Sequence, residues 1–290
     1  MKEVVEELIY AKQSKGRSRV YVSDLRYRCG KFAESFHCDI QSVDGKQIEE
    51  FLDHLKLSPR SKNNFFLAIR TLFRFAVSKK YLPKDFDELK EIELHSQLNE
   101  PIEVFTPAEL RRILAHTRLE MIPFIAIGAF AGLRHAELCR LDWSEVNLET
   151  GFIEVKALKS KTKSRRNVPI SENLAEWLMM CPNRSGRVIP FKCVGDQISE
   201  LCKATEERDA DTGSVIRPPL VWKRNGLRHS FVSYRIAAIQ NVNQVALESG
   251  NSPSVIHSNY RELVLPETAQ EWFSIVPGSR ANIVPLSASK

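Results

Sequence analysis

The sequence predicts a mainly helical α+β protein, in which a helical domain precedes a mixed α/β domain with a small antiparallel β-sheet. In the first hundred residues, apolar side chains recur at the spacing of amphipathic helices. A charged stretch without a clean period follows and contains Pro101. Beyond it, helix-start signals accompany a short β-like region that follows a turn at Gly151. The expected boundaries are 1–95 for the helical domain, about 84–104 for a linker, 105–276 for the mixed domain and 277–290 for a polar tail.

The longest helix of the first domain is expected to start at Ser58 and Pro59, because a hydroxyl cap followed by proline favours a helix start. The aromatic residues that follow at helical spacing are expected in the core rather than on a stacking surface for a ligand. This stripe consists of Phe65, Phe66, Ile69, Leu72, Phe73 and Phe75. The polar face of the same helix carries Arg60, Lys62, Asn63, Asn64, Arg70 and Arg74.

The second domain opens with a capping box, in which Thr106 is the cap, Pro107 lies in the first turn and Glu109 is the third helical residue. Residues 121–130 are apolar and predict a buried helix, which Gly132 ends. Further helices are expected from Ser171, at about 197–208 within a loop-rich stretch, and from Pro266 through Trp272 and Phe273.

Charge and cysteine usage narrow the classes of function. The chain has 290 residues and a net charge of +6 with a pI near 9.0, and six of the eleven residues at 156–166 are Lys or Arg, which fits an anionic partner. The six cysteines form no Cys-x-x-Cys pair and no metal-ligand spacing with histidine, so reduced thiols in a cytoplasmic protein are expected. The charged N-terminus does not fit a signal peptide, and no apolar run reaches membrane-spanning length, so no membrane partner is expected.

Two arginines and a tyrosine follow one another in motifs with a characteristic order. Arg134 lies in Gly-Leu-Arg-His-Ala-Glu-Leu, Arg228 in Asn-Gly-Leu-Arg-His-Ser-Phe, and Tyr260 follows about thirty residues later. In this order and spacing the chain resembles the tyrosine recombinases of the phage integrase family. The resemblance implies a catalytic domain of the mixed α/β type over 105–276. It also implies that the first domain is a helical core-binding domain that closes over DNA, with its polar helix positions facing phosphates.

The resemblance implies a role for each matched residue. Arg134 and Arg228 would clamp the scissile phosphate, since always-charged guanidinium groups suit an anion. Tyr260 would be the nucleophile and form a 3′-phosphotyrosyl link to the DNA. A lysine on a β-hairpin would protonate the leaving oxygen, and counting back from Val168 assigns Lys161, with Lys159 as second choice. The scheme implies no cofactor and no metal.

The chain departs from the family pattern at two histidine positions. Asn225 opens the second arginine motif, and Asn251 precedes the tyrosine, where the family has histidine, or tryptophan in the second case. Asparagine donates and accepts neutral hydrogen bonds but transfers no proton, and losing a general acid or base typically costs a factor of about 10² to 10⁴ in rate. His229 is expected to point about 100° away from Arg228 on a helix. His257 would share the helical face of Tyr260 and is expected to compensate for the missing histidines.

The resemblance further implies double-stranded DNA as partner, a homo-tetramer on DNA with a dimer on each site, and accessory DNA-bending or directionality proteins. Trp272 and Phe273 either contact a neighbouring protomer or pack on their own domain. Two alternatives to recombination remain at the level of the sequence. One is a DNA-binding relative with lost or weakened cleavage, and the other is a strand relaxer of the type IB topoisomerase kind.

Overall fold

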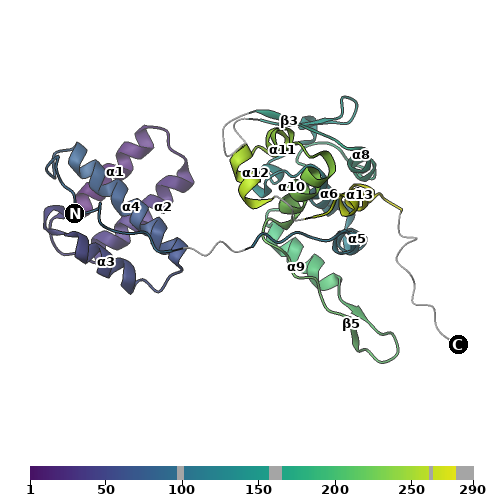
Figure 1. The fold of residues 1–290 in the computed structure, drawn as a ribbon, viewed down its shortest axis with the longest axis horizontal. Helices are drawn as coiled ribbons and strands as arrows, with labels where there is room; N and C mark the ends of the chain where they lie inside the picture. Colours follow the sequence, from purple (N-terminus) through teal and green to yellow (C-terminus); the bar gives the residue numbers. More distant parts are fainter. Residues whose placement is uncertain (97–100, 157–164, 261–263, 279–290) are drawn as a thin grey trace. The chain divides into compact units, whose positions relative to one another are not determined.

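The protein is described by a computed structural model that covers residues 1–96, 101–156, 165–260 and 264–278 (Figure 1). The chain divides into two compact units, Met1–Glu100 and Pro101–Lys290. Helices dominate both units, and short antiparallel strands occur in the second, which confirms the predicted fold class. In the described ranges, no helix is both long and apolar enough to cross a membrane.

The first unit is built from helices around an aromatic core. Helix α4 contacts the other three, so its apolar face lies at the centre of the unit. Phe65, Phe66, Ile69, Leu72 and Phe73 are buried, and Phe32 packs edge-on against Phe73, which confirms these five residues of the stripe as core. Phe75, the sixth, is only partly buried and packs against that core. The elements are α1 (Lys2–Ser14), α2 (Arg19–Glu34), η1 (Ile40–Ser42), α3 (Gly45–His54) and α4 (Pro59–Ser78).

Asn63 lies on the buried side of α4, although the sequence suggested a polar, phosphate-facing position. Its side chain accepts a hydrogen bond from the His95 N–H and donates one to the His95 carbonyl, both at 2.9 Å. A buried amide with both partners satisfied costs little to bury. Ile92, only 8% exposed, also packs into this core. The chain from α4 to His95 is therefore part of the first unit.

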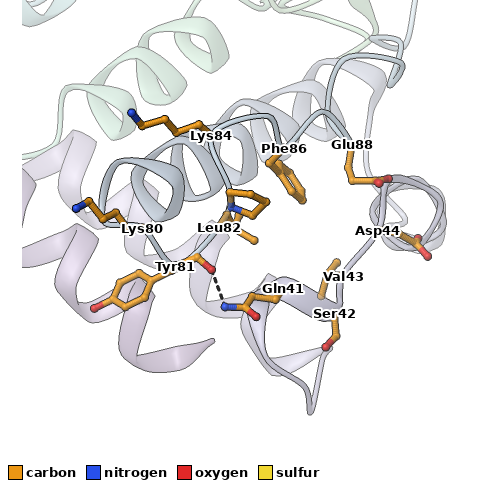
Figure 2. Close-up of a pocket in the computed structure, with 11 residues that line it drawn as sticks. Gln41, Ser42, Val43, Asp44, Lys80, Tyr81, Leu82, Lys84, Phe86 and Glu88 are labelled. Carbon is orange, nitrogen blue, oxygen red and sulfur yellow. Dashed lines mark hydrogen bonds between the residues drawn. The ribbon is translucent and has the colours of Figure 1, made fainter.

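An open hollow of about 640 Å³ lies where the chain after α4 passes η1 (Figure 2). The Gln41 amide donates to the Tyr81 carbonyl at 2.8 Å across it, and Glu88 accepts from the Gly45 N–H at 3.0 Å. Lysines and carboxylates line the hollow together, so its charges are mixed. These contacts hold the segment after α4 against α3 and η1.

In its described residues, the second unit combines helices with two small sheets. Strands β1, β2 and β3 form an antiparallel sheet in which Ile153 lies opposite Val168, and both residues face the core. Strands β4 and β5 form a separate hairpin. The strands are β1 (Val146–Asn147), β2 (Phe152–Val155), β3 (Arg166–Pro169), β4 (Glu207–Arg208) and β5 (Val215–Arg217). The helices are α5 (Pro107–His116), η2 (Leu119–Met121), α6 (Ile122–Phe130), α7 (His135–Leu138), η3 (Trp143–Glu145), α8 (Glu172–Met179), α9 (Val194–Ala204), α10 (Gly226–Ile239), α11 (Val242–Ser249), α12 (Pro253–Asn259) and α13 (Pro266–Phe273).

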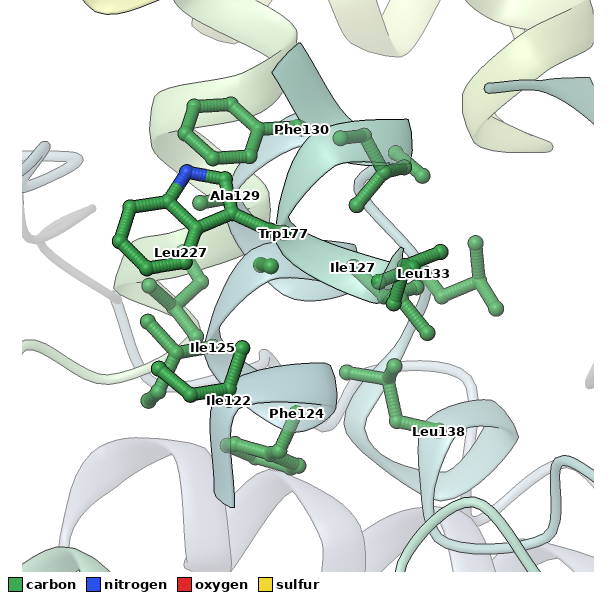
Figure 3. Packing of buried hydrophobic residues seen from close by; sticks show 14 of the residues in the cluster. Ile122, Phe124, Ile125, Ile127, Ala129, Phe130, Leu133, Leu138, Trp177 and Leu227 are labelled. Carbon is green, nitrogen blue, oxygen red and sulfur yellow. The ribbon is translucent and has the colours of Figure 1, made fainter. Parts of the chain in front are cut away.

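Helix α6 is buried at every position and forms the centre of the second unit (Figure 3). It contacts α8 and α10, and α13 packs against α10. Trp272 on α13 is fully buried, donates to the Ala129 carbonyl at 3.0 Å and stacks on Tyr234 with ring centroids 4.4 Å apart. Trp272 therefore packs on its own domain, which decides between the two alternatives predicted for it.

The capping box of Thr106 and Glu109 is present at the start of α5, as predicted.

Candidate active site

Arg134 is the N-terminal cap of the short helix α7. Gly132 precedes it with φ of +63°, a conformation that favours glycine, and an added Cβ there would collide with the ring of Phe231. The Arg134 N–H donates to Glu137 Oε2 and its Nη1 donates to Oε1, both at 3.0 Å. Glu137 therefore holds both the backbone and the guanidinium of Arg134.

A third arginine, Arg166 at the start of β3, joins this pair. Its Nη1 and Nη2 donate to the two oxygens of Glu137 at 3.1 and 2.6 Å. Its Nε donates to the Glu248 carbonyl at 3.1 Å. Arg166 lies outside the motifs that predict the other two arginines, but strand alternation is a usable signal for it, because Arg166 shares a face with the buried Val168.

Glu137 is a buried, ionised carboxylate. Burial alone would raise its pKa, but the hydrogen bonds and charge of Arg166 and of Arg134 outweigh that effect and hold the pKa below its ordinary value. Both carboxylate oxygens are fully engaged by these donors. With three guanidinium groups and one such carboxylate in this part of the site, positive charge is left over for an anionic ligand.

Arg228 on α10 is 9% exposed and is held by backbone carbonyls. Its Nη1 donates to the Gly132 carbonyl at 2.6 Å, and its Nη2 donates to the Ser249 carbonyl at 2.7 Å. Burial, followed by repulsion from Arg134, lowers its pKa to about 10, so the guanidinium stays charged at neutral pH. The two predicted arginines are thus held around the same glycine turn.

Asn251 connects the two arginines. Its Oδ1 accepts a hydrogen bond from Arg228 Nη2 at 2.8 Å and lies 3.4 Å from Arg134 Nη2, which also donates to the Gly250 carbonyl. Gly250 ends α11 with φ of +65° and turns the chain toward the arginines. Within the described ranges, the hydrogen bonds of both guanidinium groups are made by their Nη atoms and none by Nε.

Tyr260 follows α12 and is 5% exposed. His229 Nδ1 lies 2.7 Å from the Tyr260 hydroxyl, and the two ring centroids are 5.6 Å apart. Burial raises the pKa of Tyr260, while the charges of Arg228 and Arg134 act in the opposite direction. Burial and then the charge of Arg228 lower the pKa of His229. Two arginines, a tyrosine and its histidine partner thus converge from segments that span more than a hundred residues of the chain.

Part of this chain is similar in sequence to proteins of known family. The family model described as phage integrase family matches residues 103–234. Tyrosine recombinase XerD of Staphylococcus aureus is 26% identical over 193 residues, which is 61% of this chain and 63% of that protein, and XerD of Staphylococcus epidermidis matches to the same extent. Residues 103–234 therefore carry a phage integrase family domain. The chain's match covers a little under two thirds of the length of these curated recombinases.

Solved recombinase structures share the fold. Lambda integrase residues 75–356, solved as a dimer bound to a core site, aligns with a TM-score of 0.71 at 15% identity and covers 90% of this chain and 95% of that one. The Tn1549 transposon integrase, in complex with a circular intermediate DNA, aligns with a TM-score of 0.68 at 18% identity and covers 92% of this chain and 97% of that one. At these identities the likeness concerns the fold.

The remaining residues that the recombinase pattern singled out lie apart from this cluster or outside the described ranges. Asn225 is exposed, has φ of +54° at the start of α10 and makes no side-chain capping bond. His257 is exposed and makes no hydrogen bond to Tyr260, so the structure gives no support to the expectation that it compensates for the missing histidines. His229 contacts the Tyr260 hydroxyl instead, because Tyr260 lies on the side of α10 to which His229 points. Lys161 and Lys159 lie outside the described residues. No group of His, Cys, Asp and Glu in the described ranges is arranged to hold a metal.

Proposed function

We propose that this protein is a site-specific DNA recombinase that cuts and rejoins DNA strands through Tyr260. One observation carries the proposal: the guanidinium groups of Arg134 and Arg228 meet at Asn251 Oδ1, and the residue after Arg228 binds the Tyr260 hydroxyl. This brings two cations and a potential nucleophile into one site. That combination suits attack on a phosphodiester.

The chemistry assigns the two arginines to the phosphate. Attack on phosphorus concentrates negative charge on the non-bridging oxygens, and fixed donors that are already charged stabilise it without reorganising. The Nε donors of Arg134 and Arg228, which have no partner within the described ranges, are suited to these oxygens. Because the neighbouring Glu137 is shared by Arg134 and Arg166, the site keeps a net positive charge.

Tyr260 would form the covalent intermediate. Its oxygen attacks phosphorus, and the strand is stored as a 3′-phosphotyrosyl link while the 5′-hydroxyl leaves. The bond energy is conserved, so religation needs no ATP. We assign protonation of the leaving oxygen to Lys161, with Lys159 as the alternative, because a lysine near the phosphate is a suitable proton donor. Asn251 and Asn225 would each contribute a neutral hydrogen bond, and that of Asn251 orients both arginines.

Double-stranded DNA is the proposed partner. The net charge of +6 supports an anionic partner. Lambda integrase was solved as a dimer on a core site and as a tetramer on a Holliday junction, and it shares this fold. We propose the same assembly here, with a dimer on each site and a tetramer during exchange. Accessory DNA-bending or directionality proteins would then act on that complex.

Covalent trapping tests the proposal. The full chain is incubated with nicked duplexes tiled from the DNA that flanks its own gene, and protein–DNA adducts that resist denaturant are measured. The expected result is an adduct with one duplex that disappears in Tyr260→Phe and falls strongly in Arg134→Ala and Arg228→Ala. Tyr10→Phe serves as a matched control, since Tyr10 is an exposed tyrosine of the first unit. Absence of any adduct would contradict strand cleavage.

A binding-only relative is the second candidate, and the two asparagines favour it. Asn225 stands where the family has a histidine that can transfer a proton, and Asn251 stands where it has histidine or tryptophan. Asn225 is also exposed and makes no side-chain capping bond. A binding-only protein would bind one duplex selectively, form no adduct and keep the same affinity in Tyr260→Phe. The trapping experiment together with a binding measurement therefore separates the two candidates.

A further inference from the structure

The Tyr260 hydroxyl has one side-chain partner in the described part of the chain, and that partner is a histidine. His229 Nδ1 lies 2.7 Å from the hydroxyl oxygen, well within hydrogen-bond reach. The contact joins α10 to the residue after α12. Phe231, Val232 and Ile256 pack together beneath it with Tyr260 in one apolar cluster, so the two rings are held in place by the core.

No other described side chain near the tyrosine is able to take its proton. Asn251 already accepts hydrogen bonds from the arginines, and an amide does not ionise. Asn225 is exposed at the start of α10, and the exposed His257 makes no bond to Tyr260. The arginines are donors without acceptor capacity. His229 is therefore the one described group with both the geometry and the chemistry of a proton acceptor for Tyr260.

We propose that His229 is the general base of this active site: it accepts the Tyr260 proton as the tyrosine attacks DNA and returns it during religation. The inference rests on the proposed function and adds a catalytic residue to it. In the family pattern a histidine opens the second arginine motif, and in this chain that position is Asn225, which transfers no proton. His229, the residue that follows Arg228 in the same motif, meets the hydroxyl directly.

The protonation states fit this role. Burial and the charge of Arg228 lower the pKa of His229, so its imidazole is neutral at neutral pH. With the ring proton on Nε2, Nδ1 presents a lone pair to the hydroxyl. Burial raises the pKa of Tyr260, and the charges of Arg228 and Arg134 oppose that rise. The hydroxyl therefore keeps its proton at neutral pH and needs a base in order to attack.

The cleavage step balances with His229 in this role. The tyrosine O–H bond breaks, its proton moves to Nδ1, and the tyrosine oxygen forms a bond to phosphorus. The bond between phosphorus and the 5′ oxygen breaks, and its electron pair stays on that oxygen, which takes a proton from the lysine assigned above. Religation reverses each transfer, with protonated His229 returning its proton to the tyrosine oxygen as the phosphotyrosyl bond breaks.

The test uses His229→Gln, because glutamine keeps a hydrogen-bonding side chain but accepts no proton. On the duplex that traps wild-type protein, we expect its single-turnover rate of adduct formation to fall by a factor of about 10² to 10⁴. DNA affinity should change little, since neutral His229 contributes no charge to the phosphate. His257→Ala is the matched control, an exposed histidine of the neighbouring helix, and it should cleave as wild type does.

A duplex with sulfur in place of the 5′ bridging oxygen separates the base from the acid. A thiol has a pKa near 8.5, so the thiolate leaves without being protonated. The sulfur duplex should restore the rate of adduct formation by Lys161→Ala, whereas His229→Gln should remain slow on it. If the sulfur duplex rescued His229→Gln, His229 would act as the acid rather than the base. If His229→Gln formed the adduct on the ordinary duplex at a rate within about threefold of wild type, His229 would take no part in proton transfer. If wild-type protein forms no adduct, the proposed function itself fails, whereas an adduct with unaffected His229→Gln overturns this inference alone.

Discussion

Asn251 Oδ1 accepts a hydrogen bond of 2.8 Å from Arg228 Nη2, so a neutral side chain ties the buried second arginine to the turn after α11. The same oxygen lies 3.4 Å from Arg134 Nη2. A neutral acceptor orients both guanidinium groups without cancelling their charge. The site can therefore be rigid and still attract an anion.

Asn251→Asp tests this balance of orientation and charge. The carboxylate would hold the arginines at least as firmly, but it would compete with the DNA phosphate for them. Two unit charges about 4 Å apart interact by roughly 4 kcal/mol near a protein surface. We therefore expect DNA affinity and adduct formation to fall at least about tenfold below those of Asn251→Ala, which only removes the acceptor. Fluorescence anisotropy at fixed salt measures the affinity, and equal losses in both variants would contradict the charge argument.

Gly250 is predicted to be required for the site as well as for the turn. Its φ is +65°, and an added Cβ would lie 3.1 Å from Arg166 Nη1 and 3.3 Å from Arg134 Nη1. Gly151 has φ of +70° with nothing within 4 Å, so it is a matched control. Both alanine variants should lose about 1–2 kcal/mol of stability through the left-handed backbone. Only Gly250→Ala should also lose adduct formation, by at least about tenfold, and normal cleavage by it would show that the arginines adapt.

The fold class could be predicted from the spacing of apolar residues, and the motifs that contain Arg134, Arg228 and Tyr260 could be recognised because each is a short stretch at the start or end of a helix. The contact between His229 and Tyr260 escaped prediction for a different reason. The helical projection gives the direction of His229 relative to Arg228, but it does not tell which segment lies on that side. Tyr260 reaches that side of α10 through the tertiary packing of α12, which the sequence of α10 does not reveal. Asn63 was misassigned in the same way, since its partner His95 lies 32 residues away.

Glu137 is predicted to be the main electrostatic contributor to the stability of the second unit. Glu137→Gln removes the charge that pairs with the buried Arg166 and with Arg134, and breaking one side of a buried pair typically costs about 3–5 kcal/mol. Glu154→Gln is the control, because the Glu154–Arg165 pair is solvent-exposed and such pairs contribute about 0–1 kcal/mol. Urea unfolding followed by tryptophan fluorescence reports on this unit, since all four tryptophans lie in it. Similar losses in the two variants would contradict the prediction.

The contribution of Glu137 to the free energy of unfolding should also decrease at acidic pH. Its folded pKa lies below the ordinary value of 4.5, because Arg166 and Arg134 outweigh the effect of burial. The stability that it contributes is thus fully present above about pH 4.5 and is lost as the pH falls through the lower folded pKa. The difference in unfolding free energy between wild type and Glu137→Gln should be constant near neutral pH and shrink in acid. A difference that grows on acidification would mean that the carboxyl is protonated in the folded protein.

The rate of DNA cleavage should decrease at acidic pH, because His229 can accept a proton only in its neutral form. The pKa of His229 lies below its ordinary value of 6.5, owing to burial and then to Arg228. The single-turnover rate of wild-type protein should therefore be level above about pH 6.5 and decrease as the imidazole becomes protonated at lower pH. His229→Gln should be slower throughout and lack this decrease, and DNA binding measured at each pH excludes loss of affinity as the cause. Parallel profiles for the two proteins would assign the acid limb to a group other than His229.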